Sequence, residues 1–224
     1  PARARIDPHT LESKRGLKPN AGPLAAHTEV ATKTDQAIFI GGFFGADAKN
    51  LKDVRLLNIA GKILSTRATD DIREKQQLAY SPNVNNVPGT EYPNLGMVAF
   101  ISPTAPSKVE TLAAAVDELL GAFAKDGPTE EEMQTARKQF ANSFDEQMRD
   151  PSFWTDVLRG LDYRGRTLAN IMEAPQAYQG FTAAEVKEAF ARYNTPERSF
   201  RLWMRPKAES KAEPKTDPDP TGDK

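Results

Sequence analysis

The chain has 224 residues, 38% of them hydrophobic, with a formal net charge of -1 and no cysteine. The balanced charge argues against nucleic acid or an anionic bilayer as a partner, and the missing cysteines exclude disulfides and thiolate metal sites. This length is ordinary for one larger α+β domain, so one core is expected. No stretch reaches the roughly 20 apolar residues that a membrane helix needs, so no membrane span is predicted.

Both ends of the chain are polar. Residues 1–28 are broken by prolines and a glycine and are predicted to be a linker. Residues 207–224 carry no apolar residue larger than alanine, so they cannot bury enough surface to offset their ordering entropy and are predicted to be a disordered tail. The folded domain is therefore expected at residues 29–206.

The domain begins with a strand and a long helix. Residues 36–44 are too continuously apolar for a sheet with one face in water, which predicts a central strand. Apolar residues then recur at three- and four-residue steps from about 48 to 75, which predicts an amphipathic helix. Arg73 lies at its C-terminal end, where a positive charge suits the helix dipole.

Two more strands are predicted at residues 78–87 and 95–102, joined by a turn rich in Pro, Gly and Asn. Helices follow, and capping boxes mark three of their starts: Ser107 with Glu110, Thr129 with Glu132, and Thr182 with Glu185. Further helices are expected after Asp150, which precedes a proline, and around residues 167–178. Alternating residues 200–205 predict a last strand. This order of elements indicates an α+β fold, an antiparallel sheet with helices packed on one face.

The run Ile72-Arg73-Glu74-Lys75-Gln76-Gln77-Leu78-Ala79-Tyr80-Ser81-Pro82 joins the predicted long helix to the next strand. It resembles the R-E-K-x-x-L-A-Y-S motif of the non-catalytic half of pitrilysin/insulinase-type zinc peptidases. Residues 39–44 and 127–132 are also similar to family segments, a first strand and a G-x-T-x-E-E helix start. Many members have R-G-L-A-Y where this chain has Gln76 to Tyr80, so the glycine that shapes that turn is missing here.

Catalytic members of this family hold zinc with an H-x-x-E-H motif, which places two imidazoles on one side of a helix. This chain contains only His9 and His27, eighteen residues apart, and both are predicted to be plain surface residues. No metal site is assigned to the chain. The resemblance implies a zinc-bearing pitrilysin-type domain or subunit as the partner, and this partner can be fused, separate or a second copy in a homodimer.

The resemblance also implies that Arg73 and Tyr80 contact a peptide substrate opposite the partner's zinc. A guanidinium is suited to donating to carbonyl oxygens, and the Tyr80 hydroxyl can donate to the scissile carbonyl as charge develops there. Each residue has a plainer alternative. Arg73 can be a solvated helix-end residue paired with Asp70 or Glu74, and Tyr80 a strand residue with its ring in the core.

Three other features have competing interpretations. Gly41-Gly42 is predicted to mark a strand bulge, the alternative being close approach of a peptide or neighbouring strand. The acidic run Glu130-Glu131-Glu132 resembles a metal site only by composition, and the helix dipole explains it better. Phe153 and Trp154 are expected to pack in the core, the alternative being a partner interface.

Two classes of function stay open. The resemblance favours the substrate-binding half of a zinc-dependent endopeptidase that cleaves peptides or unfolded segments. The alternative is a catalytically inactive pitrilysin-like scaffold or interaction subunit, and an unrelated ferredoxin-like module is a third option. The sequence does not decide the compartment, and a periplasmic or other extracytoplasmic location is compatible with it.

Overall fold

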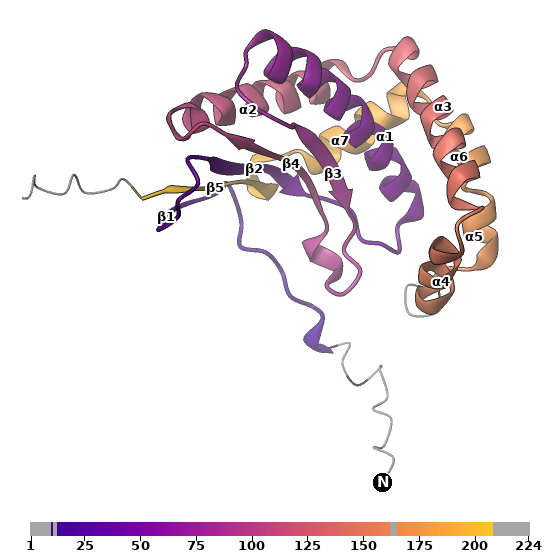
Figure 1. Cartoon of the computed structure of the whole chain (residues 1–224). Coiled ribbons are helices and arrows are strands. Elements are labelled where there is room, and N and C mark those ends of the chain that lie inside the picture. The colour runs from indigo at the N-terminus through magenta and orange to yellow at the C-terminus, as the bar shows by residue number, and fades with distance from the viewer. Residues whose placement is uncertain (1–9, 11–12, 162–164, 208–224) are drawn as a thin grey trace, which may run out of the picture.

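The computed structural model describes residue 10 and residues 13–161 and 165–207. Within this part of the chain, one sheet carries helices on one of its faces (Figure 1). The strands lie in the order β1-β5-β2-β4-β3. Their bounds are Leu24–Val30 (β1), Ala37–Phe44 (β2), Asn83–Val87 (β3), Met97–Thr104 (β4) and Ser199–Pro206 (β5). The α+β class predicted from the sequence is confirmed.

The helices follow the predicted order closely. Their bounds are Leu51–Ala68 (α1), Val109–Asp126 (α2), Glu130–Gln147 (α3), Pro151–Gly160 (α4), Leu168–Met172 (α5), Ala174–Gly180 (α6) and Ala183–Tyr193 (α7). Short helical turns are Thr69–Lys75 (η2, a π-helix), Pro93–Leu95 (η3), Pro106–Lys108 (η4) and Pro196–Arg198 (η5). In the described part, no helix is long and apolar enough to cross a bilayer.

Strand β2 lies at the centre of the sheet, as predicted, and runs antiparallel to both β4 and β5. The edge strand β1 was not predicted. It runs parallel to β5, with Leu24 opposite Phe200, so the expectation of a wholly antiparallel sheet is wrong at this edge. Six of the seven β1 residues are exposed, and without a buried face the strand shows no hydrophobic alternation.

Part of β1 falls inside the predicted linker at residues 1–28. Its His27 is exposed, as expected, but its ring stacks on Trp203 with 5.6 Å between ring centroids. His9 and residues 208–224 of the predicted tail lie outside the described residues.

The two faces of the sheet differ in what covers them. On one face, Phe39 and Phe43 of β2 are fully buried beneath the helices. Phe43 contacts Phe190 of α7 edge-on at 5.0 Å between ring centroids, and Phe190 contacts Phe123 of α2 at 4.8 Å. The opposite face carries apolar side chains that stay partly in solvent: Ile38 (41% exposed), Ile101 (38%), Leu202 (38%) and Met204 (43%). We call this the open face.

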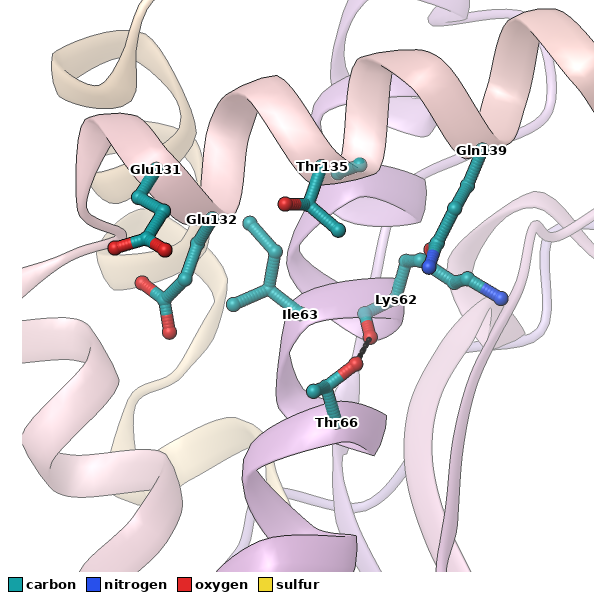
Figure 2. A pocket seen from close by; sticks show the side chains of 8 residues that line it. Lys62, Ile63, Thr66, Glu131, Glu132, Thr135 and Gln139 are labelled. Carbon is teal, nitrogen blue, oxygen red and sulfur yellow. Dashed lines mark hydrogen bonds between the residues drawn. The ribbon is translucent and has the colours of Figure 1, made fainter.

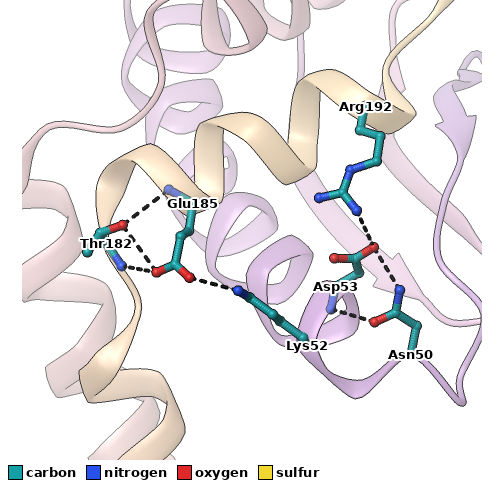
Figure 3. A network of polar contacts seen from close by, with 6 residues as sticks. All are labelled: Asn50, Lys52, Asp53, Thr182, Glu185 and Arg192. Atoms are coloured by element: carbon teal, nitrogen blue, oxygen red, sulfur yellow. Dashed lines mark hydrogen bonds and ion pairs between the residues drawn. The ribbon is translucent and has the colours of Figure 1, made fainter.

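A buried carboxylate joins the start of α1 to the end of α7 (Figure 3). Asp53 Oδ2 accepts hydrogen bonds from Asn50 Nδ2 at 2.8 Å and from the Tyr193 hydroxyl at 2.7 Å, and it lies 3.1 Å from an Arg192 nitrogen. Burial and the bond to Asp53 raise the pKa of Tyr193 from 10.0 to about 12. The network fixes the helix that places Phe190 over the sheet.

Two capping boxes form as predicted, at Thr129 and at Thr182. The box predicted at Ser107 does not form, because Pro106 starts a 3-10 turn that takes in Ser107, and α2 begins only at Val109. Asp150 caps α4 as expected.

The outer edge of β3 is covered by α1. The backbone N–H of Val84 donates to the Ser65 hydroxyl at 2.9 Å, and this hydroxyl lies 3.3 Å from the Val84 carbonyl oxygen. Asn86 Nδ2 donates to the backbone carbonyl of Val54 at 3.1 Å. Gly61 permits this close approach, since a Cβ there would lie 3.1 Å from the Val84 oxygen.

Candidate functional site

Arg73 and Tyr80 line one cavity of about 260 Å³ at the end of the long helix. Its other lining residues are Gln77, Leu78, Ala79, Ala105 and Lys108. Both predicted residues are accessible: the Arg73 side chain is 51% exposed and Tyr80 is 54% exposed. The fold therefore brings together the two residues singled out from the sequence and leaves them open to solvent.

Arg73 lies on a π-helical turn and not at the end of one continuous α-helix. The predicted helix at 48–75 divides into α1, which ends at Ala68, and η2, which ends at Lys75. Buried Ile72 keeps η2 against the core, and its carbonyl oxygen accepts the N–H of Leu78 at 2.9 Å. Such π-helical segments are rare and occur frequently at functional sites.

Gln77 forms the turn that follows η2, and its φ angle is +55°. This left-handed conformation is uncommon for a residue other than glycine. In the R-G-L-A-Y pattern that this run resembles, glycine stands at the position of Gln77, and the turn has a conformation that glycine favours. Two hydrogen bonds hold it: Gln77 N–H donates to the Arg73 carbonyl at 3.1 Å, and Lys108 Nζ donates to the Gln77 carbonyl at 2.9 Å.

Tyr80 lies in a loop, because β3 begins only at Asn83 and not at residue 78 as predicted. The loop is attached to the end of β4. Thr104 Oγ1 donates to the Leu78 carbonyl at 2.6 Å, and Tyr80 N–H donates to the Pro103 carbonyl at 3.2 Å. Leu78 and Ala79 are buried, so the backbone is anchored while the phenol projects outward. The alternative of a strand tyrosine with its ring in the core is wrong.

The electrostatic character of the cavity comes from hydrogen-bond donors. None of its seven lining residues is acidic, whereas Arg73 and Lys108 carry positive charge. Arg73 Nε lies 3.4 Å from a Glu74 carboxylate oxygen, but both side chains are more than half exposed. An ion pair this exposed contributes little and leaves the guanidinium available. The arrangement is suited to binding carbonyl or carboxylate oxygens.

Lys108 and Thr104 were not singled out from the sequence. Lys108 lies 31 residues from Gln77 along the chain, and only the packing of η4 against the loop brings them together. A lysine at a predicted helix start carries no signal that would associate it with Tyr80.

Gly41 and Gly42 do not form the predicted bulge. The pairing of β2 with β4 runs without interruption from Ala37 to Phe44. A Cβ on Gly42 would clash with the carbonyl oxygen of Val98 on β4, and one on Gly41 would meet the Phe39 ring. The glycines therefore permit close approach of neighbouring groups, as the alternative interpretation held.

The acidic run at the start of α3 borders a cavity of about 160 Å³ between α1 and α3 (Figure 2). Glu132 has structural partners here: its carboxylate accepts from the Thr129 N–H at 2.7 Å and binds Arg67 through both oxygens at 2.6 and 2.8 Å. The bond from Arg67 lowers the pKa of Glu132. Among the described residues, no three His, Asp or Glu side chains form a group that could hold a metal ion.

Phe153 and Trp154 do not pack in the core as expected. Both are only half-buried, and α4 has no fully buried residue. Trp154 Nε1 donates to the Met148 carbonyl at 3.0 Å, which holds α4 against the end of α3.

Comparison with known proteins identifies relatives. The family described as "Peptidase M16 inactive domain" matches residues 7–140. A stretch of 123 residues is 29% identical to the uncharacterized zinc protease YmxG of Bacillus subtilis, covering 52% of this chain and 29% of that protein.

Solved structures share the fold. A peptidase M16 inactive domain from Pseudomonas fluorescens superposes with a TM-score of 0.71 at 19% identity, covering 92% of this chain and 47% of that one. A protease from Helicobacter pylori gives a TM-score of 0.72 at 16% identity, covering 84% and 46%. The chain thus spans less than half the length of each of these relatives.

Proposed function

The chain belongs to the family of peptidase M16 inactive domains, and on that premise we propose that it is the substrate-binding half of a zinc endopeptidase. Its substrates would be peptides or unfolded segments. A zinc-bearing M16 domain or subunit would supply the metal site, and this partner can be fused to the chain or separate.

One observation carries this proposal: Arg73 on η2 and Tyr80 on the anchored loop that follows η2 line the same cavity. The anchoring bonds run to η2 through the Ile72 carbonyl and to β4 through Thr104. Because the backbone at this site is already fixed, binding a ligand would cost little backbone entropy. This fixed backbone supports a role in positioning substrate.

The two side chains would have different roles. The Arg73 guanidinium offers a fork of N–H donors for carbonyl oxygens of the bound peptide backbone. The Tyr80 hydroxyl would donate to the scissile carbonyl oxygen as negative charge develops on it. Zinc in the partner would activate the attacking water. This chain would contribute positioning and oxyanion stabilisation.

The first test is Tyr80→Phe in the complex reconstituted with its zinc-bearing partner. This change removes one hydroxyl and keeps the ring, so it should lower kcat about 100-fold while sparing the fold. Tyr92→Phe is the matched control, because Tyr92 is also an exposed tyrosine but does not line the cavity, and it should leave kcat unchanged.

Arg73→Ala tests the second role. It should raise KM as well as lower kcat, because the guanidinium would contact the peptide before reaction. The double variant should lose less than the product of the two single losses if both residues contact one carbonyl region. Arg159→Ala controls for loss of an exposed arginine elsewhere. Full activity in both single variants with partner binding intact would reject the proposed site and favour the inactive scaffold.

A further inference from the structure

Lys108 and Arg73 are the two charged residues that line the Arg73/Tyr80 cavity. The Lys108 side chain is exposed and lies at the start of α2, with Nζ 2.9 Å from the Gln77 carbonyl oxygen. Among the described residues it makes no ion pair. An ammonium group has three donors, so one bond to Gln77 leaves two for a ligand.

The charges of the cavity are unbalanced. Two cations and a phenol converge, and no carboxylate lines the cavity to neutralise them. Glu74 pairs with Arg73 at 3.4 Å, but the Glu74 side chain is itself 64% exposed and does not line the cavity. A peptide carbonyl alone would leave the Lys108 ammonium without a matching charge, whereas a carboxylate would supply it.

The geometry points to a carboxylate subsite: Lys108 selects peptides that present a carboxylate beside the carbonyl contacted by Arg73 and Tyr80. This inference rests on the proposed function. The volume of about 260 Å³ is below the roughly 300–1,000 Å³ of sites that enclose a drug-sized ligand. The cavity is therefore suited to one residue of a longer chain. The carboxylate can come from an Asp or Glu side chain or from the peptide C-terminus.

The test compares matched peptides in the reconstituted complex. In the first kind of pair, one peptide carries Glu and the other its neutral isostere Gln at the same position beside the scissile bond, and each flanking position is tested in turn. In the second kind of pair, one peptide has a free C-terminus and the other an amidated one. The wild-type complex should prefer the charged member of at least one pair by about fivefold in kcat/KM, the upper end for an exposed ion pair. Preference in the first pair identifies a side-chain carboxylate, and preference in the second identifies the terminal one.

Lys108→Gln should abolish this preference, because a neutral amide cannot attract a carboxylate but can still donate to the Gln77 carbonyl. Lys108→Arg should retain the preference. Lys125→Gln, an exposed lysine at the other end of α2, should leave the preference intact. The wild-type preference should also weaken as salt rises, because screening shortens the range of the attraction.

Two results would overturn the inference. One is a wild-type complex without preference in either pair. The other is an equal fall for charged and neutral peptides in Lys108→Gln, which would mean that Lys108 only supports the loop. Neither result changes the effect expected for Tyr80→Phe on kcat. The carboxylate subsite can therefore be rejected while the proposed function stands. If Tyr80→Phe and Arg73→Ala are fully active, the function itself fails.

Discussion

Both faces of the sheet carry apolar side chains, but helices cover one face and solvent reaches the other. On the covered face, Phe39, Phe43 and Phe100 have no exposed surface. On the open face, Ile38 and Met204 lie in neighbouring strands and each keeps about two fifths of its surface in solvent, 41% and 43%. Strand β2 is apolar on both sides, so its side chains alternate between helical cover and solvent.

A hydrophobic pattern can predict where a strand lies in a sheet without predicting which of its faces is buried. Continuous apolar character correctly placed β2 at the centre of the sheet, but the premise that neither face meets water is wrong in the described structure, where Ile38 of β2 is exposed. Burial energy scales with apolar area removed from water, so the covered face should dominate the stability of the domain. Substitutions on the two faces can measure this contrast directly.

The largest effect is expected for Phe43→Ala on the covered face. It removes a ring packed edge-on against Phe190 and should lower the free energy of unfolding by about 3–5 kcal/mol. Urea denaturation followed by circular dichroism measures this change. A loss below about 1 kcal/mol would mean that the helical layer does not depend on this contact.

A smaller effect is expected for Tyr193→Phe, which probes the polar attachment of α7 to the covered side. It removes the hydrogen bond to Asp53 and should cost about 1.5 kcal/mol at neutral pH. The fold favours the protonated phenol, since its pKa is raised from 10.0 to about 12. This contribution is therefore present below pH 10 and lost as pH rises toward 12.

The same pair of proteins provides the pH test. The stability difference between wild type and Tyr193→Phe should shrink between pH 10 and 12, as measured by urea denaturation at each pH. Subtracting the variant removes the contribution of lysines that titrate in the same range. A difference independent of pH would contradict the assigned role of the phenol.

The smallest effect is expected for Ile38→Thr on the open face. Threonine keeps the β-branch, and the lost burial is partial, so the cost should stay below about 1 kcal/mol. Differential scanning calorimetry on Ile38→Thr and Phe43→Ala compares the two faces of one strand. If the two variants are equally destabilised, the contrast between the faces does not hold.

The sequence was sufficient to predict those elements that are marked by residues close together along the chain. Thr129 with Glu132 and Thr182 with Glu185 marked helix starts because a capping box needs only residues three apart. Strand β1 could not be predicted, because an exposed edge strand has no apolar face to produce a pattern. The π-helical turn was missed because Ile72 also fits the spacing of a continuous α-helix.

Some residues of the candidate site could be found from the sequence, and others only from the tertiary structure. Arg73 and Tyr80 were found because they lie only seven positions apart, within one family motif. Lys108 and Thr104 reach the same loop through tertiary packing, which no local spacing records. The left-handed conformation of Gln77 was also hidden, because glutamine does not indicate positive φ.

The cover of α1 over β3 limits how molecules of this protein could join edge to edge. Strands at sheet edges can recruit other strands, and repeated recruitment at both edges produces fibres. At the β3 edge, the Val84 N–H already donates a hydrogen bond to Ser65. At the other edge, no strand in the described structure pairs with the outer side of β1. Two molecules joined through β1 would each present a blocked β3 edge outward. Such association would close as a pair and could not propagate.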